Sequence, residues 1–167
     1  NQNIANISGS TVSITNAGQT SITATLSADN NYNSGTIPTS FVVNKKNQTI
    51  TVGALPTTKP LKDFTSIPIT ASSSSGSPIV ISLSAGSAAS VSGTVGNYEL
   101  VSIQQTGLVT ITFTTDDSGN PNYNSATTTV VIDVVKTNQN ISFNTTPTTQ
   151  LTYTENLDLT LNAVASS

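Results

Sequence analysis

The stretch 116–120 holds the densest set of side chains that could support chemistry. Asp116, Asp117, Ser118 and Asn120 place oxygen ligands around Gly119, and such oxygens are the ligands that Ca²⁺ prefers. No Glu stands nearby to supply the bidentate ligand typical of calcium loops. We therefore expect a solvated turn here and no bound metal.

Acid–base catalysis has equally little support. Asp116 and Asp117 are adjacent, so on a strand their carboxylates would point to opposite faces of the sheet. A related loop earlier in the chain has only Asp29, and Glu155 and Asp158 are isolated charges that we place on the surface. We expect no catalytic residues, no metal site and no cofactor.

The composition excludes further classes of protein. The 167 residues include no Cys, His, Met, Trp or Arg. Thiolate or imidazole zinc sites, Ser-His-Asp triads and haem ligation through His or Cys are therefore impossible. With a net charge of −3, the chain has no excess of positive charge that would attract nucleic acid. No run of 18 apolar residues occurs, so we expect no membrane insertion.

Two tyrosines and three lysines recur at matching positions. Tyr32 and Tyr123 each sit in an Asn-Tyr-Asn-Ser stretch. A ring that packs on the edge of a sandwich is the favoured interpretation, and an exposed ring that stacks on a sugar is the alternative. Lys45, Lys46 and Lys136 mark two similar junctions, which we interpret as solvated linkers.

The chain repeats itself with a period of about 90 residues, and such periods are typical of modular arrays. Residues 45–52 (KKNQTITV) are echoed 91 positions later by residues 136–143 (KTNQNISF). Residues 31–34 return as residues 122–125 at the same offset. Three further echoes relate 7–9 to 91–93 (offset 84), 13–18 to 102–107 (offset 89) and 67–71 to 159–163 (offset 92).

These echoes predict three segments. Residues 1–46 would be the C-terminal half of one repeat, residues 47–136 a complete repeat, and residues 137–167 the N-terminal third of the next. Two of the changes in offset fall in Gly, Asn, Asp and Pro stretches, including five extra residues near 94–98, where loops tolerate insertions. We interpret the chain as an excerpt of a longer tandem array. A less favoured alternative is that partial copies complement each other head to tail in a filament.

Within the complete copy, short runs with period-two alternation predict about seven strands and no helix. Thr and Ser at alternate positions suit a solvated face, while Ile, Val, Leu and Phe suit a face packed on a second sheet. Seven short strands in about 90 residues favour an all-β, immunoglobulin-like sandwich. The runs lie at 50–52, 67–71, 79–83, around Val91, and at 100–103, 109–113 and 130–134.

Several motifs resemble those of the bacterial immunoglobulin-like repeats of Big or MBG type. The chain carries NQTITVGALP at 47–56, SSGSPI at 74–79, SVSG at 90–93, TGLVTIT at 106–112 and NPNYNSA at 120–126. The resemblance implies tandem arrays on large surface adhesins, gliding or biofilm proteins, or virion fibres and decoration proteins. Its motifs carry no catalytic residues.

We accordingly expect a non-catalytic spacer or stalk, extracellular at a cell surface or alternatively on a virion, whose partners are neighbouring repeats. One alternative is a carbohydrate- or receptor-binding module. Another is a module appended to a secreted enzyme whose catalytic part lies elsewhere. Junctions such as residues 43–47 have no Gly/Ser linker, so we expect a limited hinge and an elongated shape.

Overall fold

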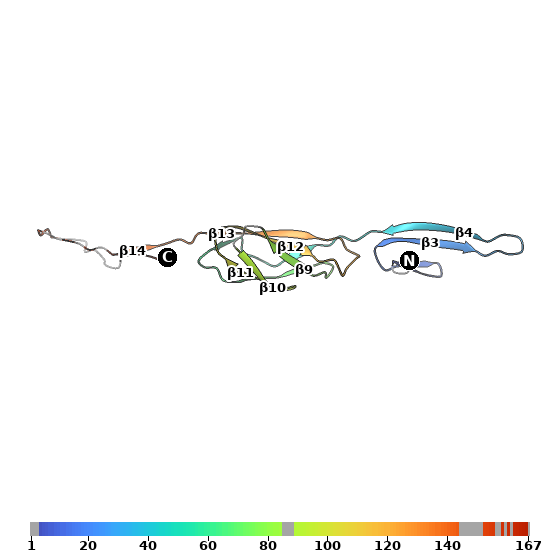
Figure 1. Cartoon of the computed structure of the whole chain (residues 1–167), viewed down its shortest axis with the longest axis horizontal. Helices are drawn as coiled ribbons and strands as arrows, with labels where there is room; N and C mark the ends of the chain where they lie inside the picture. The colour runs from blue at the N-terminus through green and yellow to red at the C-terminus, as the bar shows by residue number, and fades with distance from the viewer. Residues whose placement is uncertain are drawn as a thin grey trace.

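The computed structural model describes residues 4–84, 89–143, 152–155, 158, 160 and 162–166. All regular elements in these residues are β-strands, which confirms the expectation of an all-β chain. In this part of the chain, no helix is present that could cross a membrane. In Figure 1 the strands are arranged along one long axis. Two hairpins lie at one end, a layered body lies in the middle, and a short strand pair lies at the other end.

The central body is built from two main sheets. One has the strand order β10-β11-β7, and the other has the order β6-β13-β12-β9. A short pair, β5 with β8, adjoins the first sheet because β8 follows β7 after one residue, Thr70. The strands are β5 (Ile50–Val52), β6 (Thr58–Pro60), β7 (Ile67–Ile69), β8 (Ala71–Ser73), β9 (Ile79–Leu83), β10 (Ala89–Thr94), β11 (Asn97–Ile103), β12 (Gly107–Thr115) and β13 (Thr127–Val135).

The two main sheets share one hydrophobic core. Along β12 the buried residues alternate strictly with more exposed ones, because successive side chains of a strand point to opposite faces. Phe113 and Ile111 are fully buried, while the intervening Thr112 lies on the outer face. The buried cluster comprises Ile69, Ile79, Leu100, Ile103, Val109, Ile111, Phe113, Ile132 and Val134. Both sheets contribute to it, so the arrangement is consistent with a β-sandwich.

All seven runs with period-two alternation form strands, but two details differ from the expectation. The strand β6 was not expected, and it pairs in parallel with β13 through Thr58, Lys59 and Pro60. The run around Pro68 is divided into β7 and β8, which pair with different partners, β11 and β5. Both features depend on pairing with distant strands, which alternation along the chain does not specify.

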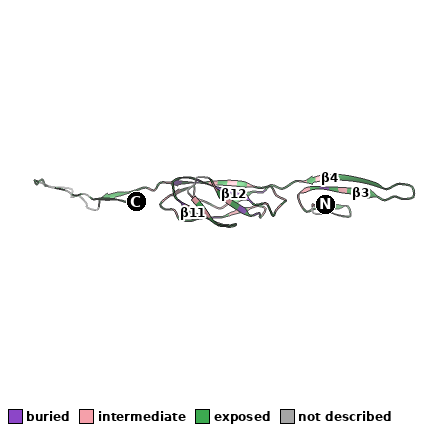
Figure 2. Cartoon of the chain, viewed as in Figure 1, coloured by how far each residue is buried: buried purple, intermediate pink, exposed green. Residues whose placement is uncertain are grey.

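The remaining strands form three hairpin-like pairs outside the central body (Figure 1). They are β1 (Ala5–Ser8) with β2 (Thr11–Ile14), β3 (Gly18–Leu26) with β4 (Gly35–Val43), and β14 (Ile141–Phe143) with β15 (Ala163–Ala165). Figure 2 shows that buried residues concentrate in the central body, whereas these pairs are mostly exposed. Leu26 and Ile37, for example, are 69% and 70% exposed.

The outer pairs reproduce the strand registers of the central body. Offsets of 89 and 91 carry the pair Gly18–Val43 of β3–β4 onto Gly107–Val134 of β12–β13, and both pairs are observed. Likewise, β1–β2 matches the start of β10–β11, and β14–β15 matches β5–β8. The extra residues near 94–98 lengthen the hairpin, because β10 and β11 have six and seven residues where β1 and β2 have four each.

Truncating the central aromatic side chain tests whether this core holds the body together. We expect Phe113→Ala to lower the free energy of unfolding by about 3–5 kcal/mol, because it removes a buried ring and leaves a cavity. Leu108→Ala, on the same strand but 66% exposed, should change it by less than about 0.5 kcal/mol. Urea denaturation followed by circular dichroism measures both, and equal effects would contradict this account of the core.

Candidate functional site: a polar junction at one end of the sandwich

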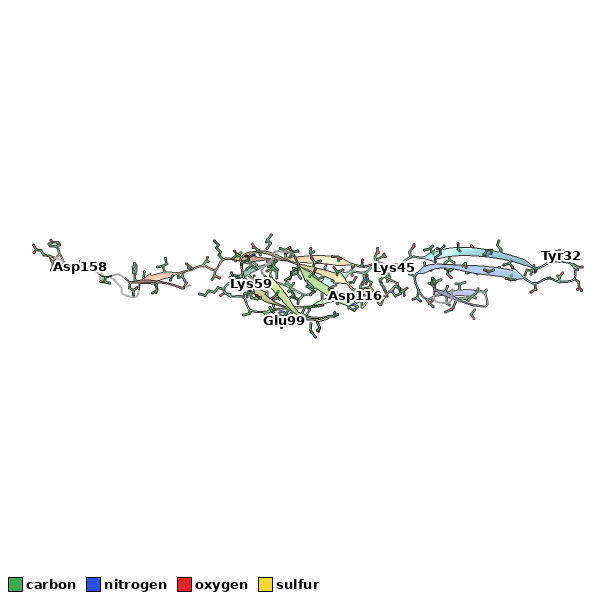
Figure 3. All side chains as sticks on the ribbon, viewed as in Figure 1. Tyr32, Lys45, Lys59, Glu99, Asp116 and Asp158 are labelled. Atoms are coloured by element: carbon green, nitrogen blue, oxygen red, sulfur yellow. The ribbon has the colours of Figure 1, made fainter. Side chains whose placement is uncertain are left out.

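Four loops meet where the N-terminal hairpins join the central body. The linker 44–49 leaves β4 and enters β5, and the loop 116–126 connects β12 to β13. The β8–β9 turn (74–78) and the β2–β3 turn (15–17) complete the site. In Figure 3, Lys45 and Asp116 lie at this end of the body, toward β3 and β4.

Gln48 is the centre of the junction, and only 8% of it is exposed. Its Nε2 donates to the backbone oxygen of Asn124 at 2.7 Å and to Asp117 Oδ1 at 2.8 Å, with Thr115 Oγ1 farther away at 3.3 Å. Its Oε1 accepts a hydrogen bond from the Ser75 hydroxyl. A buried amide is tolerated when its donors and acceptor are satisfied, and here they join the linker, the 116–126 loop and the β8–β9 turn.

Serine hydroxyls extend this network through the β8–β9 turn. Ser75 Oγ and Ser77 Oγ lie 2.9 Å apart, within hydrogen-bond distance, and Ser73 Oγ donates to the Ser77 carbonyl at 2.7 Å. Ser77 itself is buried, and its hydroxyl receives a longer contact of 3.4 Å from Asn120 Nδ2. The turn is thereby held against the 116–126 loop by side chains as well as by the backbone bond from Asp116 N–H to Pro78 O, 2.7 Å long.

Asn122 and Asn124 connect the loop to the linker. Lys46 N–H donates to Asn122 O at 2.8 Å, and Asn124 N–H donates to Lys46 O at 2.9 Å. These two bonds bracket a parallel bridge between Lys46 and Tyr123. Asn124 Nδ2 also donates to Asn47 Oδ1 at 2.8 Å. The linker is therefore paired like a short strand and is not free to swing.

Asn122 also reaches the preceding hairpins. Its Oδ1 accepts from Ala17 N–H at 2.7 Å, and its Nδ2 donates to Asn16 Oδ1 at 3.0 Å. Both contacts are partly buried and join residues more than 100 positions apart. A single side chain thus bonds the β2–β3 turn to the end of the central body.

The suggested calcium ligands are engaged separately. Asp117 Oδ1 accepts from Gln48, while its buried Oδ2 has no hydrogen-bond partner among the described residues. Asp116 is exposed, and the Ser118 backbone N–H and hydroxyl lower its carboxyl pKa from the usual 3.8. No group of three or more His, Cys, Asp or Glu that could hold a metal occurs among the residues described. Whether this loop binds calcium stays untested, and the expectation is still a turn without metal.

The two tyrosines differ in their surroundings. Tyr123 is half-buried at the junction. Tyr32 is 72% exposed at the tip between β3 and β4, at the far end of the hairpin from Lys45 in Figure 3. The packing interpretation is therefore wrong for Tyr32, because no sheet covers it in this part of the chain.

The isolated charges lie on the surface. Lys45, Lys136, Glu155 and Asp158 are all exposed. The side chain of Lys46 is exposed too, but its backbone carries the linker contacts, so the linker is more ordered than the expected solvated segment.

Comparisons with protein-family models, with curated proteins and with solved structures found no match for this chain. The assignment of this site therefore depends on its own geometry.

Sequence reasoning did not single out Gln48, Asn122 or Asn124 as functional residues. Two signals pointed to them: Gln48 recurs as Gln139, and the Asn-Tyr-Asn stretch recurs as well. The recurrence by itself indicates a family motif and a packing tyrosine, because contacts more than 60 positions apart cannot be read from local spacing.

Replacing the buried amide tests the network. We expect Gln48→Ala to destabilise the central body by about 2–3 kcal/mol, because buried partners lose their hydrogen bonds, one of them charged. A shift of this size lowers the melting temperature of a domain of this length by roughly 10–20 °C. Gln139→Ala, the exposed counterpart, should leave the melting temperature unchanged. If both variants melt like the parent chain, Gln48 does not hold this end together.

Proposed function

We propose that the chain is a non-catalytic spacer, a piece of an extended array of immunoglobulin-like sandwiches that projects or decorates an extracellular surface. The observation that carries the proposal is the junction, where backbone pairing at Lys46 and the side chain of Asn122 bond one unit to the next. A spacer needs stiffness between units more than it needs a reactive site.

The strand order of the central body supports the immunoglobulin-like assignment. In constant-type domains one sheet has the order A-B-E-D and the other has C-F-G. Here β5 and β8 pair, β7 continues to β11 and β10, and β9-β12-β13 form the facing sheet. Gly53 N–H donates to Thr70 O at 2.8 Å. This bond extends the pairing of the first strand, β5, beyond β8 to Thr70, the residue that separates β8 from β7.

The shared registers support a tandem arrangement. The pairs β1–β2 and β3–β4 match β10 to β13, and β14–β15 matches β5–β8. Even a side-chain contact recurs, because Thr49 N–H donates to Ser74 Oγ and Asn140 N–H donates to Ser166 Oγ. We accordingly assign residues 1–46, 47–136 and 137–167 to three successive repeats, similar to those of Big or MBG type.

We place such an array outside the cell. A cell-surface adhesin or stalk and a virion fibre or decoration protein are both compatible with it. The chain has no Cys or Met, so few of its side chains are open to oxidative damage.

Small-angle X-ray scattering at dilute concentration tests the stiffness of the junction. The parent chain should scatter as a rod, and Asn122→Ala should broaden its distribution of shapes. Two lost hydrogen bonds change docking by about 1–2 kcal/mol, roughly five- to thirty-fold in the ratio of docked to undocked units.

The control is Asn31→Ala, which alters the corresponding asparagine of the exposed loop. It should leave the rod unchanged. A compact parent particle, or a parent as flexible as the Asn122→Ala variant, would overturn the spacer proposal.

A binding module is the second candidate, and the exposed ring of Tyr32 favours it. Aromatic rings exposed at loop tips offer an apolar face with a polar end. A glycan array probed with the chain and with Tyr32→Ala separates the two candidates. The spacer proposal expects no signal from either protein, whereas binding that is lost on Tyr32→Ala would replace it with carbohydrate recognition.

A further inference from the structure

The segment that enters the central body and the segment that leaves it are bonded side by side in parallel. We propose that this contact, between residues 46 and 57–61 on one side and residues 122–124 and 133–135 on the other, is a clamp that resists stretching of the repeat by its two ends. The inference rests on the proposed spacer and adds a load-bearing function to it, because a spacer held at one end and loaded at the other carries tension along its length.

Strand direction distinguishes this parallel clamp from the rest of the fold. The strand β6 pairs in parallel with β13, and the isolated bridge between Lys46 and Tyr123 is parallel too. Every other strand pairing among the described residues is antiparallel. One parallel contact lies just before the start of β13 and the other lies at its end. The entering segment is therefore bonded to the leaving segment at both ends of the body.

At the far end of the body, β6 is bonded to β13 on both sides of its centre. Asp133 N–H donates to Thr57 O at 2.9 Å, and Leu61 N–H donates to Val135 O at 3.0 Å. Backbone groups alternate in direction along a strand, so the backbone of Lys59, midway between these two bonds, faces β13 as well. The pairing is thus continuous over the length of β6.

At the linker, side-chain bonds reinforce the backbone contact. Lys46 exchanges two backbone hydrogen bonds with the 122–124 loop, 2.8 and 2.9 Å long. Two residues later, the buried Gln48 donates to Asn124 O and to Asp117 Oδ1. A pull on the linker is therefore passed directly to the loop that leads into β13, without first displacing the apolar core.

The direction of the pull determines how these bonds break. In Figure 1 the linker before β5 and the chain after β13 leave the central body on opposite sides. Tension therefore draws β6 and β13 in opposite directions along their length. Hydrogen bonds that run across this sliding direction are loaded together and must fail together, whereas an antiparallel hairpin pulled at its open end loses its bonds one at a time.

Pulling the same chain in two directions tests the clamp, and introduced thiols can serve as handles because the sequence contains no cysteine. Lys45→Cys with Lys136→Cys loads the entering and leaving segments. Gln104→Cys with Lys136→Cys instead loads the open end of the β12–β13 hairpin, where Gly107 pairs with Val134. All three handle positions are exposed. In optical tweezers, we expect the central body to unfold at least about ten-fold more slowly at equal force in the first geometry, because several bonds break together.

A matched pair of proline substitutions tests the bonds themselves. Lys59→Pro removes an N–H that faces β13, whereas Thr58→Pro removes one on the outer side of β6, which is an edge strand. The chain already has a proline at the next outward-facing position, Pro60. With the handles at 45 and 136, we expect Lys59→Pro to raise the unfolding rate under force by about ten-fold and Thr58→Pro to leave it unchanged. With the handles at 104 and 136, Lys59→Pro should have a smaller effect.

Equal unfolding rates in the two pulling geometries overturn the clamp, and that comparison needs no substitution within β6. Equal effects of Lys59→Pro and Thr58→Pro would also contradict it. Failure of the clamp is distinct from failure of the spacer proposal, because the scattering of the dilute rod and its response to Asn122→Ala involve no applied force.

Discussion

No disulfide joins the two sheets of the central body, since the chain contains no cysteine. Their cohesion depends on excluding water from one shared apolar layer. The largest fully buried side chains, Phe113, Leu100, Ile111, Ile132 and Val134, come from β11, β12 and β13. A buried side chain of this kind contributes about 1.5–3 kcal/mol of transfer free energy, so a few aliphatic residues and one aromatic ring must fit closely. The outer faces can then be Thr and Ser, because they contribute little to cohesion.

At the end of the body that faces the linker, hydrogen bonds rather than apolar contacts hold the loops together. Gln48 is buried, and its amide satisfies partners on two loops, 116–126 and 74–78. Directional bonds determine how loops lie relative to one another, which apolar contact does not. Because Gln48 directly follows the linker residues that pair with the 122–124 loop, the same network that closes the sandwich also sets the path of the chain entering it.

Alternation along the chain predicted the strands well where both faces have a consistent character. The strand β12 is the clearest case, since Val109, Ile111 and Phe113 alternate with Thr and all three are buried. Residues 58–60 show no such pattern, and β6 forms because β13 offers a free edge to pair with. Tyr32 and Tyr123 have nearly identical local sequences, yet one is exposed and the other half-buried. The difference lies in which other segments of the chain contact each loop, and local sequence does not encode these contacts.

The sequence by itself determined that the chain is all-β, that its strands recur at offsets near 90, and that thiolate, imidazole and guanidinium chemistry are absent. These properties depend on residue type and on spacing within one strand. Only the tertiary structure decided that Gln48 is buried, that Asn122 bonds the β2–β3 turn to the body, and that loop 31–33 remains uncovered. The physical reason is that each of these depends on hydrogen bonds or burial between segments far apart in the chain, which form or fail according to which loops the fold brings together.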